Sequence, residues 1–338
     1  MFNSLSIAKL INGNRRQFFK WGLVTGVGIA GTAVGLKALQ PTQRKIVPIP
    51  EIPDTTKIES IGINPLAFAR HFDYGKIIEE NGRKIREFRV EARTTPVKLN
   101  EAVTFITWNL NGQVPGPTFR ATEGDRIRVI FYNKAGGHSH SLHFHGIHEA
   151  NMDGVRPVRN GAVFIYEFDA IPFGVHLYHC HIAPVTRHIS KGLYGMFIID
   201  PKEPRPPADE MVLIMAGYDV NDDYKNELYA FNGLPDYYMH HPIPVWKNEL
   251  IRLYVLNMIE FDPVATFHVH ANMFQVYRTG RTLNPTEETD VITMGTAERH
   301  ILELSYPYTG KFMFHPHQDL IAEEGCMGYF DVREKTTS

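Results

Sequence analysis

The sequence predicts an all-β protein with two tandem β-sandwich domains, and three observations support this prediction. First, from residue 57 onward, short stretches of alternating apolar and polar residues are separated by Gly, Pro, Asn and Asp. This pattern is typical of half-buried strands joined by turns. Second, no long stretch of this region has the periodicity of an amphipathic helix. Third, a series of motifs occurs twice, about 125–135 residues apart, as expected of a duplicated domain.

The N-terminal segment differs in composition from the rest of the chain. Arg15 and Arg16 precede a Gly-rich apolar run at 21–36, an order typical of a twin-arginine export signal. A single membrane helix is the alternative, but a run of 16 residues with five glycines is short for a span. We therefore expect a signal at 1–40 and a Pro-rich linker at 41–56, with the folded protein exported to the periplasm or another extracytoplasmic compartment. No clear A-x-A cleavage site is present, so a retained membrane anchor stays open.

The strands that we expect in the first half follow the alternation of apolar residues. They lie at 85–91, 102–108, 126–132, 164–168 and 196–199. The strand-like segment at 124–133 recurs at 248–257, and the Pro-rich stretch at 201–207 lies between the two copies. The sequence therefore predicts domain 1 at 57–203 and domain 2 at 204–338.

Composition excludes some functions and draws attention to one residue type. Lys and Arg number 35 against 37 Asp and Glu, a net charge of −2 that offers no electrostatic basis for binding nucleic acid. Two cysteines cannot form a disulfide framework. Histidine is the outlier, because its 17 residues include five His-x-His pairs where composition alone predicts about one.

Four of these pairs indicate a metal centre. Side chains i and i+2 lie on the same face of a strand, so each pair aims two imidazoles into the same space. Two pairs occur in each half of the chain at matching repeat positions, so a chance arrangement would have to arise twice. Eight imidazoles suit about three copper ions, since copper is among the metals that imidazole favours. They belong to His143, His145, His179, His181, His268, His270, His315 and His317.

Cys180 indicates the identity of the metal. It lies between His179 and His181, so strand alternation turns its thiol to the opposite face. His140 and His188 are available to join it, and two imidazoles with one thiolate form the trigonal set of a blue-copper electron-transfer site. The alternatives are a buried free thiol or a disulfide with Cys326.

Together these motifs resemble those of the multicopper oxidases. The likeness rests on His140-Ser-Leu-His143-Phe-His145-Gly146, His179-Cys180-His181, His268-Val-His270 and His315-Pro-His317, and it covers nearly all of residues 57–334. The two-domain length is similar to the small-laccase-like group, which is related to copper nitrite reductases. The resemblance implies cupredoxin-like Greek-key sandwiches and about four copper ions per chain.

The resemblance also implies a role for each ligand. His140, Cys180 and His188 would hold a type 1 copper. His143 and His268 would hold a type 2 copper. A type 3 pair would be held by His145, His179, His181, His270, His315 and His317. Single electrons from a small reducing substrate would pass along Cys180 to the trinuclear cluster, where O₂ is reduced to water. Each domain supplies only four of the eight histidines, and the two-domain group suggests a homotrimer with copper clusters between subunits.

The sequence departs from the family pattern in domain 2. Ala265, Pro316 and Ile321 stand where a second blue site would need His, Cys and His, so only domain 1 can carry one. Cys326 is therefore expected to be a small core residue. In the family, the axial ligand of the type 1 copper lies five residues after the second histidine ligand. Counting from His188, this position is Leu193, which is not a sulfur ligand. If the loop is shifted relative to the family pattern, Met196 would be the axial residue instead.

Proton delivery and the remaining histidines are less strongly indicated. Asp153 matches the acidic proton-relay position of the family, with a plain turn aspartate as the alternative. Glu323 follows His317 and could serve the other side of the cluster. We expect His138, His148 and His176 to be non-ligands beside the ligands. His240, His241 and His300 are expected at the surface.

The sequence thus favours a copper oxidase that uses O₂, with a phenol, an aromatic amine or a metal ion as its electron donor. A copper nitrite reductase shares the two-domain plan but leaves several of the eight histidines without a purpose. A cupredoxin-type electron carrier would need only His140, Cys180 and His188. The identity of the donor is not encoded in any motif, because substrate surfaces lie on loops.

Overall fold

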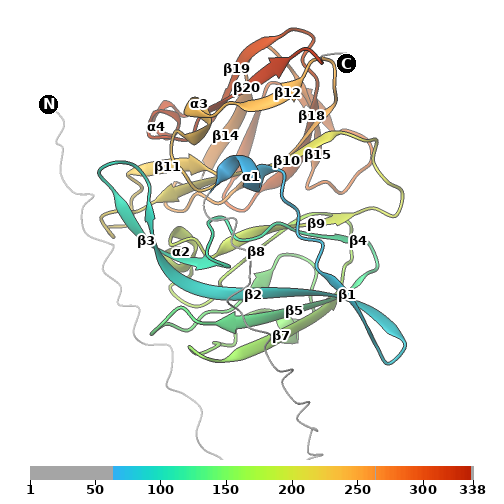
Figure 1. Cartoon of the computed structure of the whole chain (residues 1–338), viewed down its shortest axis with the longest axis vertical. Coiled ribbons are helices and arrows are strands. Elements are labelled where there is room, and N and C mark those ends of the chain that lie inside the picture. The colour runs from blue at the N-terminus through green and yellow to red at the C-terminus, as the bar shows by residue number, and fades with distance from the viewer. Residues whose placement is uncertain (1–63, 263, 336–338) are drawn as a thin grey trace, which may run out of the picture. The chain divides into compact units, whose positions relative to one another are not determined.

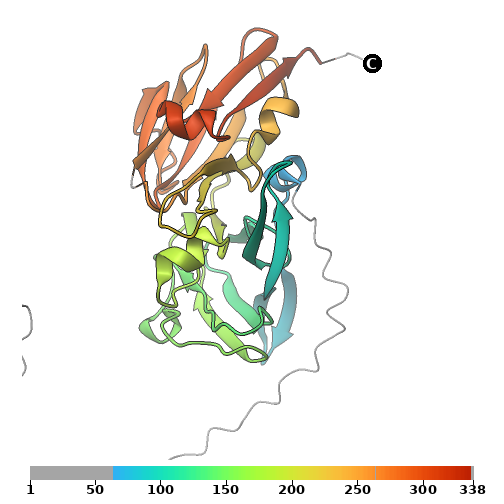
Figure 2. The same ribbon diagram turned by 90° about the vertical axis from the view of Figure 1, so that its left-hand side faces the viewer.

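The computed structural model describes residues 64–262 and 264–335, which form two β-sandwiches (Figure 1). In Figure 2 the strands of domain 1, cyan to yellow-green, and those of domain 2, yellow to red, form two separate groups. The expected signal at 1–40 and linker at 41–56 lie outside the described residues, so export and anchoring stay predictions. None of the described helices is long and apolar enough to cross a membrane.

Domain 1 consists of two sheets that enclose an apolar core. One sheet has the order β1-β2-β5-β7, with β3 also paired to β2; its strands are β1 (Lys76–Glu80), β2 (Arg83–Lys98), β3 (Thr104–Leu110), β5 (Arg126–Asn133) and β7 (Val163–Asp169). The other has the order β4-β9-β8-β6, with β4 (Phe119–Thr122), β9 (Tyr194–Asp200), β8 (Gly174–His179) and β6 (His143–Phe144). The core between them is rich in phenylalanine, including Phe88, Phe119, Phe131, Phe144 and Phe197.

Domain 2 repeats this plan. One sheet has the order β11-β10-β13-β18-β15-β16, with β11 (Leu228–Phe231), β10 (Asp209–Tyr218), β13 (Ile251–Asn257), β18 (Arg299–Leu304), β15 (Phe274–Arg278) and β16 (Glu287–Thr289). The other has the order β12-β20-β19-β14-β17, with β12 (Ile243–Trp246), β20 (Gly328–Arg333), β19 (Gly310–His315), β14 (Val264–Val269) and β17 (Val291–Gly295). The all-β, two-sandwich prediction is confirmed. The five strands expected in domain 1 overlap β2, β3, β5, β7 and β9, and the longest described helix, α2 (Val185–Ser190), has six residues.

One boundary differs from the expected one. The sequence assigns residues from 57 onward to domain 1, but α1 (Pro65–Ala69) packs on domain 2, where Ala69 is part of the core. Arg70 donates two hydrogen bonds to Asp209, and the Tyr238 hydroxyl donates to the Pro65 carbonyl. Five residues are too few to show which domain their apolar face will contact, so sequence periodicity could not have placed this helix.

The two domains also contact each other through a shared apolar layer and through backbone hydrogen bonds. Leu177 and Ile198 of domain 1 pack with Ile214 and Leu256 of domain 2. The Val175 amide donates to the Thr279 carbonyl at 2.8 Å, and Arg299 Nε donates to the Val175 carbonyl at 3.0 Å. These contacts anchor β8, the strand that ends in the His179-Cys180-His181 motif.

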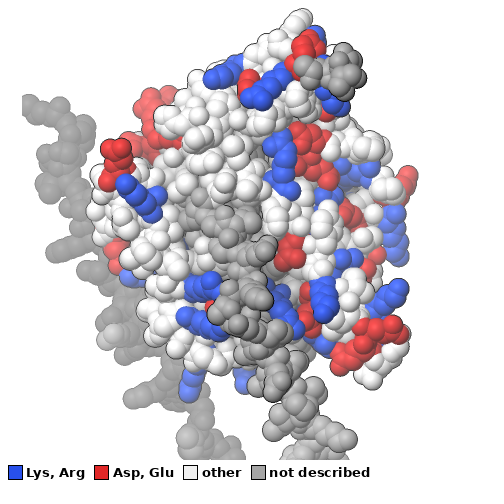
Figure 3. Space-filling model, viewed as in Figure 1, with Lys and Arg blue, Asp and Glu red and all other residues white. Residues whose placement is uncertain are grey.

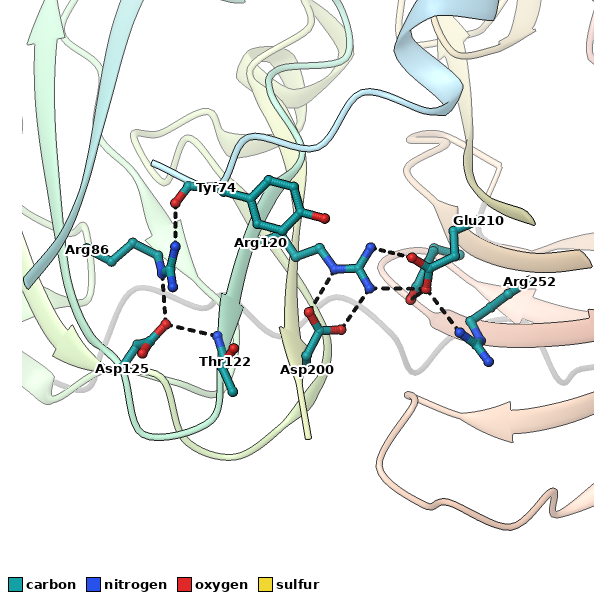
Figure 4. Close-up of polar contacts among 9 residues, drawn as sticks. Tyr74, Arg86, Arg120, Thr122, Asp125, Asp200, Glu210 and Arg252 are labelled. Atoms are coloured by element: carbon teal, nitrogen blue, oxygen red, sulfur yellow. Dashed lines mark hydrogen bonds and ion pairs between the residues drawn. The ribbon is translucent and has the colours of Figure 1, made fainter. Parts of the chain in front are cut away.

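A network of ion pairs links the domains as well (Figure 4). Arg120 on β4 donates to both carboxylate oxygens of Asp200 at the end of β9 and to both of Glu210 on β10. Arg252 donates to Glu210 and to Glu303, so the network continues into β13 and β18. Elsewhere charges are mixed, and on the face drawn in Figure 3 Lys and Arg are interspersed with Asp and Glu and form no continuous basic surface.

Candidate metal centres

His140, Cys180 and His188, which we call the Cys180 set, come together in domain 1 from three separate elements. His140 lies before β6, where its backbone pairs with Val158. Cys180 directly follows β8, and His188 lies on α2. All three are buried, with 0%, 0% and 5% of their surfaces exposed. The expected type 1 ligands are therefore neighbours in a site closed to water.

The donor atoms of the Cys180 set fit a trigonal metal ion. The two Nδ1 atoms are 3.1 Å apart, and Cys180 Sγ lies 3.1 Å from His188 Nδ1 and 3.8 Å from His140 Nδ1. Three donors at bond lengths of about 2.0–2.3 Å around one metal would be roughly 3.5 Å apart. Cys180 and Cys326 are both free thiols, so the alternative of a disulfide is wrong.

Burial also sets the protonation of this set. It lowers the pKa of His140 to about 3 and that of His188 to about 4, so both imidazoles are neutral at pH 7, the form that ligates metals. Burial raises the pKa of the Cys180 thiol, with backbone and side-chain hydrogen bonds opposing it. A metal ion would therefore displace a proton from the sulfur on binding.

His143, His145, His179 and His181, the domain 1 quartet, form a second cluster. His145 Nε2 and His179 Nε2 are 2.9 Å apart, and the rings of His143 and His181 stack at 4.9 Å. His143 Nδ1 donates to the Asp153 carbonyl, and His179 Nδ1 donates to the Cys180 carbonyl. Because a carbonyl can only accept, these bonds place the proton on Nδ1 and leave Nε2 free for a metal.

His268, His270, His315 and His317, the domain 2 quartet, repeat this arrangement. His270 Nε2 and His315 Nε2 are 3.1 Å apart, while the Nδ1 atoms of His268 and His315 donate to the carbonyls of Asp290 and Pro316. In all four His-x-His pairs the first histidine ends or lies within a strand, and the second follows that strand.

The two quartets differ in exposure and do not meet within the chain. His270 and His317 are exposed, and the domain 2 quartet borders an open hollow of about 490 Å³. Among the described residues, every potential metal-binding group draws its side chains from a single domain. Each quartet is therefore half of a possible eight-histidine site.

Of the two acidic residues expected to deliver protons, Asp153 lies beside a histidine quartet and Glu323 does not. Asp153 Oδ1 lies 3.0 Å from His143 Nδ1 and 3.5 Å from His148 Nε2, so Asp153 borders the domain 1 quartet. Asp290 occupies the corresponding place in domain 2, with its carbonyl 2.7 Å from His268 Nδ1. Sequence reasoning missed Asp290, because it follows its histidine by 22 residues where Asp153 follows by 10, and the repeat gives no matching offset. Glu323 is exposed on α4 (Asp319–Glu323) and belongs to none of the potential metal groups among the described residues.

Leu193 and Met196 lie on opposite sides of their sheet. The Leu193 amide donates to the His188 carbonyl, and its carbonyl accepts from the Cys180 amide, so Leu193 lies between two members of the Cys180 set. Its side chain packs in the same core as Cys180. Met196 packs instead in the apolar layer between the domains.

The remaining candidate positions lie in the domain cores or beside the quartets. Ala265, Ile321 and Cys326 are buried in the apolar core of domain 2, and among the described residues no potential metal-binding group of that domain contains a cysteine. His176 Nδ1 lies 3.0 Å from the His145 carbonyl, beside the quartet. The expectation that His300 is at the surface is wrong, since it is 2% exposed on β18 and accepts a hydrogen bond from the Thr279 amide.

Comparisons with known proteins agree with this geometry. Two family profiles, each described as multicopper oxidase, match residues 91–204 and 205–336. A solved multicopper oxidase is 47% identical, with a TM-score of 0.79 over 80% of this chain and 98% of that chain. A copper nitrite reductase from Nitrosomonas europaea is 28% identical, with a TM-score of 0.69 over 74% of this chain and 94% of that chain. The copper-containing nitrite reductase of Neisseria gonorrhoeae is 26% identical over 72% of this chain and 67% of its own length.

The two profiles together cover domain 1 from the middle of β2 onward, all strands of domain 2, and every residue of the Cys180 set and the two quartets. This chain belongs to the multicopper oxidase family.

Proposed function

We propose that the protein is a copper-dependent oxidase that takes single electrons from a small reducing substrate and passes them to O₂. The observation that carries the proposal is the duplicated quartet, because eight imidazoles are more than a single mononuclear copper site can use. The 47% identity to a multicopper oxidase, which spans nearly all of that chain, supports the same proposal.

Different residues of the chain would bind copper, transfer electrons and transfer protons. Bound copper would supply one-electron transfer at the Cys180 set and O₂ reduction at the quartets. Cys180 is covalently continuous with His179 and His181, so the backbone joins the buried set to the domain 1 quartet. The facing Nε2 atoms of His145 and His179 would share one metal ion, and those of His270 and His315 another. The Asp153 carbonyl holds His143 in its orientation, and the partly exposed Asp153 carboxylate would take protons from water and pass them on to the site.

The separation of the quartets supports the proposal of a homotrimer with clusters between subunits. A domain 1 quartet would meet the domain 2 quartet of a neighbour, a head-to-tail contact that closes into a ring. Exposed apolar side chains lie on the elements that carry the domain 2 quartet or follow it: Val291 pairs with His268 across the sheet, Val264 begins β14, and Leu320 lies on α4 just after His317. We also propose export by the twin-arginine signal at 1–40, with cleavage or retention as an anchor to be tested on the mature N-terminus.

A copper nitrite reductase is the second candidate, favoured by the names of the relatives in Nitrosomonas europaea and Neisseria gonorrhoeae. A nitrite reductase would use fewer of the eight histidines. A cupredoxin-type carrier would need only the Cys180 set.

Copper analysis and light scattering on the same purified sample separate these candidates. We expect about four copper ions per chain in a trimer that consumes O₂ with a phenol, an aromatic amine or a metal ion. About two per chain with nitrite turnover would favour the reductase, and about one with neither activity would favour the carrier. A fully active monomer would rule out clusters shared between subunits.

The axial position provides a further prediction. Leu193 has no lone pair to donate to a copper ion in the Cys180 set. The lack of an axial donor favours Cu(I) over Cu(II) and therefore gives a high reduction potential. Leu193→Met is expected to lower the potential by on the order of tens of millivolts and to alter the blue spectrum, because the thioether can donate. Met196→Leu is the matched control and should change neither in spectroelectrochemical titration. The opposite pattern would make Met196 the axial residue.

A further inference from the structure

The Cys180 set has no direct opening to solvent, and Trp108 lies over it. The indole on β3 contacts both imidazoles of the set, with ring centroids 4.8 Å from His188 and 5.3 Å from His140. His188 itself is only 5% exposed, and Trp108 is 8% exposed. The Trp108 amide donates to the Lys191 carbonyl just after α2, which fixes β3 against the helix that carries His188.

An exposed imidazole in turn covers Trp108. The ring of His138 packs on the indole with centroids 4.4 Å apart and an interplanar angle of 42°, while its other side faces solvent. Asn133 Nδ2 donates to the His138 carbonyl at 2.8 Å, which holds the backbone in place. Three aromatic rings therefore lead in sequence from solvent to the buried set.

The approach to His138 is open along the backbone that precedes it. Gly136 and Gly137 precede it, both exposed with positive φ, and a Cβ built on either would meet no atom within 4 Å. A flat molecule can therefore lie against the His138 ring without displacing side chains. None of the potential metal-binding groups among the described residues includes His138, so a metal-ion donor would find a single ligand there.

We propose that the His138–Trp108 stack is where an aromatic donor, a phenol or aromatic amine, binds and gives up its electron. The inference rests on the proposed function and deepens it by naming the donor class and the residues that receive it. A phenol stacked on His138 loses one electron and, to bulk water, its hydroxyl proton, and leaves as a phenoxyl radical. The electron would pass through the ring contacts of Trp108 to His188 and His140, and bound Cu(II) would supply the one-electron acceptor there.

The first test needs no copper. Saturation-transfer NMR of the copper-free protein with 2,6-dimethoxyphenol measures donor binding directly. We expect His138→Ala to weaken binding roughly fivefold, because one aromatic stacking contact is lost, and His138→Phe to restore it. His241→Ala is the matched control, since His241 is also exposed and packs on Tyr237 with centroids 4.6 Å apart and an interplanar angle of 38°. It should leave binding unchanged.

The second test uses the copper-loaded protein. In His138→Ala we expect a higher KM for 2,6-dimethoxyphenol with little change in kcat, and a smaller effect on ferrocyanide, which offers no ring to stack. The blue absorption and the type 1 potential should be unchanged, because His138 is not a ligand. Equal binding and equal KM in His138→Ala and wild type would overturn the inference. Lack of O₂ uptake by wild type would instead overturn the proposed function, and the copper-free binding result would still stand.

Discussion

Cys180→Ser is expected to abolish the intense visible absorption and reduce O₂ uptake to a small residue of the wild-type rate, about 1% or less. The thiolate is the source of the blue colour in a His₂Cys copper site, and serine cannot replace it. Cys180 also links the buried set to His179 and His181 through the backbone, and serine keeps this backbone but lacks the thiolate that would join it to the copper, so the electron path is lost at its first step. The two quartets keep all eight imidazoles, so we expect the variant to lose about one copper ion per chain and retain about three.

Cys326→Ser is the matched control, because Cys326 is equally buried and free but lies in the core of domain 2. We expect its absorption spectrum and O₂ uptake to equal those of wild type, apart from a modest loss of stability on burying a hydroxyl. Absorption spectroscopy and copper analysis of both variants check the prediction. A Cys180→Ser protein that keeps the blue band would place the chromophore elsewhere.

Of the variants considered, Arg120→Met is expected to lower the free energy of unfolding most, by about 2–4 kcal/mol. This corresponds to a decrease of roughly 5–10 °C in melting temperature. Arg120 has only 10% of its side chain exposed and donates to two carboxylates from different elements, Asp200 and Glu210. Methionine fills much of the same volume but removes the Arg120 cation from both carboxylates, so that among the described residues Glu210 keeps only Arg252 as a cationic partner. The cost stays below that of a fully buried pair because the carboxylate side chains are 31% and 21% exposed.

The loss should depend on pH in a defined direction. Burial alone would raise the pKa of Glu210, but hydrogen bonds and charge from Arg120, Tyr254 and Arg252 lower it below its ordinary value of 4.5. A lowered carboxyl pKa stabilises the folded state above pH 4.5, and this contribution disappears as the pH falls through the folded-state pKa. The difference between wild type and Arg120→Met should therefore be full at about pH 7 and shrink below about pH 4 in thermal unfolding.

Arg333→Met is the control for removing an arginine, because its bond to Asp331 is exposed at the surface and should contribute little. Arg120→Lys should fall between the two, since it keeps the charge but loses the planar fork that reaches both carboxylates. Equal melting temperatures for Arg120→Met and Arg333→Met would show that the network does not hold the domains together.

The sequence by itself determined the features that depend on local period and on the repeat. Strand alternation is a property of neighbouring residues, so it was sufficient to pair His143 with His145 and to turn Cys180 away from His179. The repeat was sufficient to divide the chain into two sandwiches and to match the two quartets. The absence of ligands at Ala265 and Ile321 likewise followed from comparing the two copies.

Only the tertiary structure decided the features that depend on contacts between distant segments. Which nitrogen of His143 or His268 is free depends on a carbonyl 10 or 22 residues away, and no local pattern encodes that carbonyl. The burial of His300 and the packing of α1 on domain 2 arise from neighbouring strands, and strand or helix period alone cannot identify these partners. The cover of Trp108 over the Cys180 set has the same origin, because β3, β8 and α2 come together only when the domain closes.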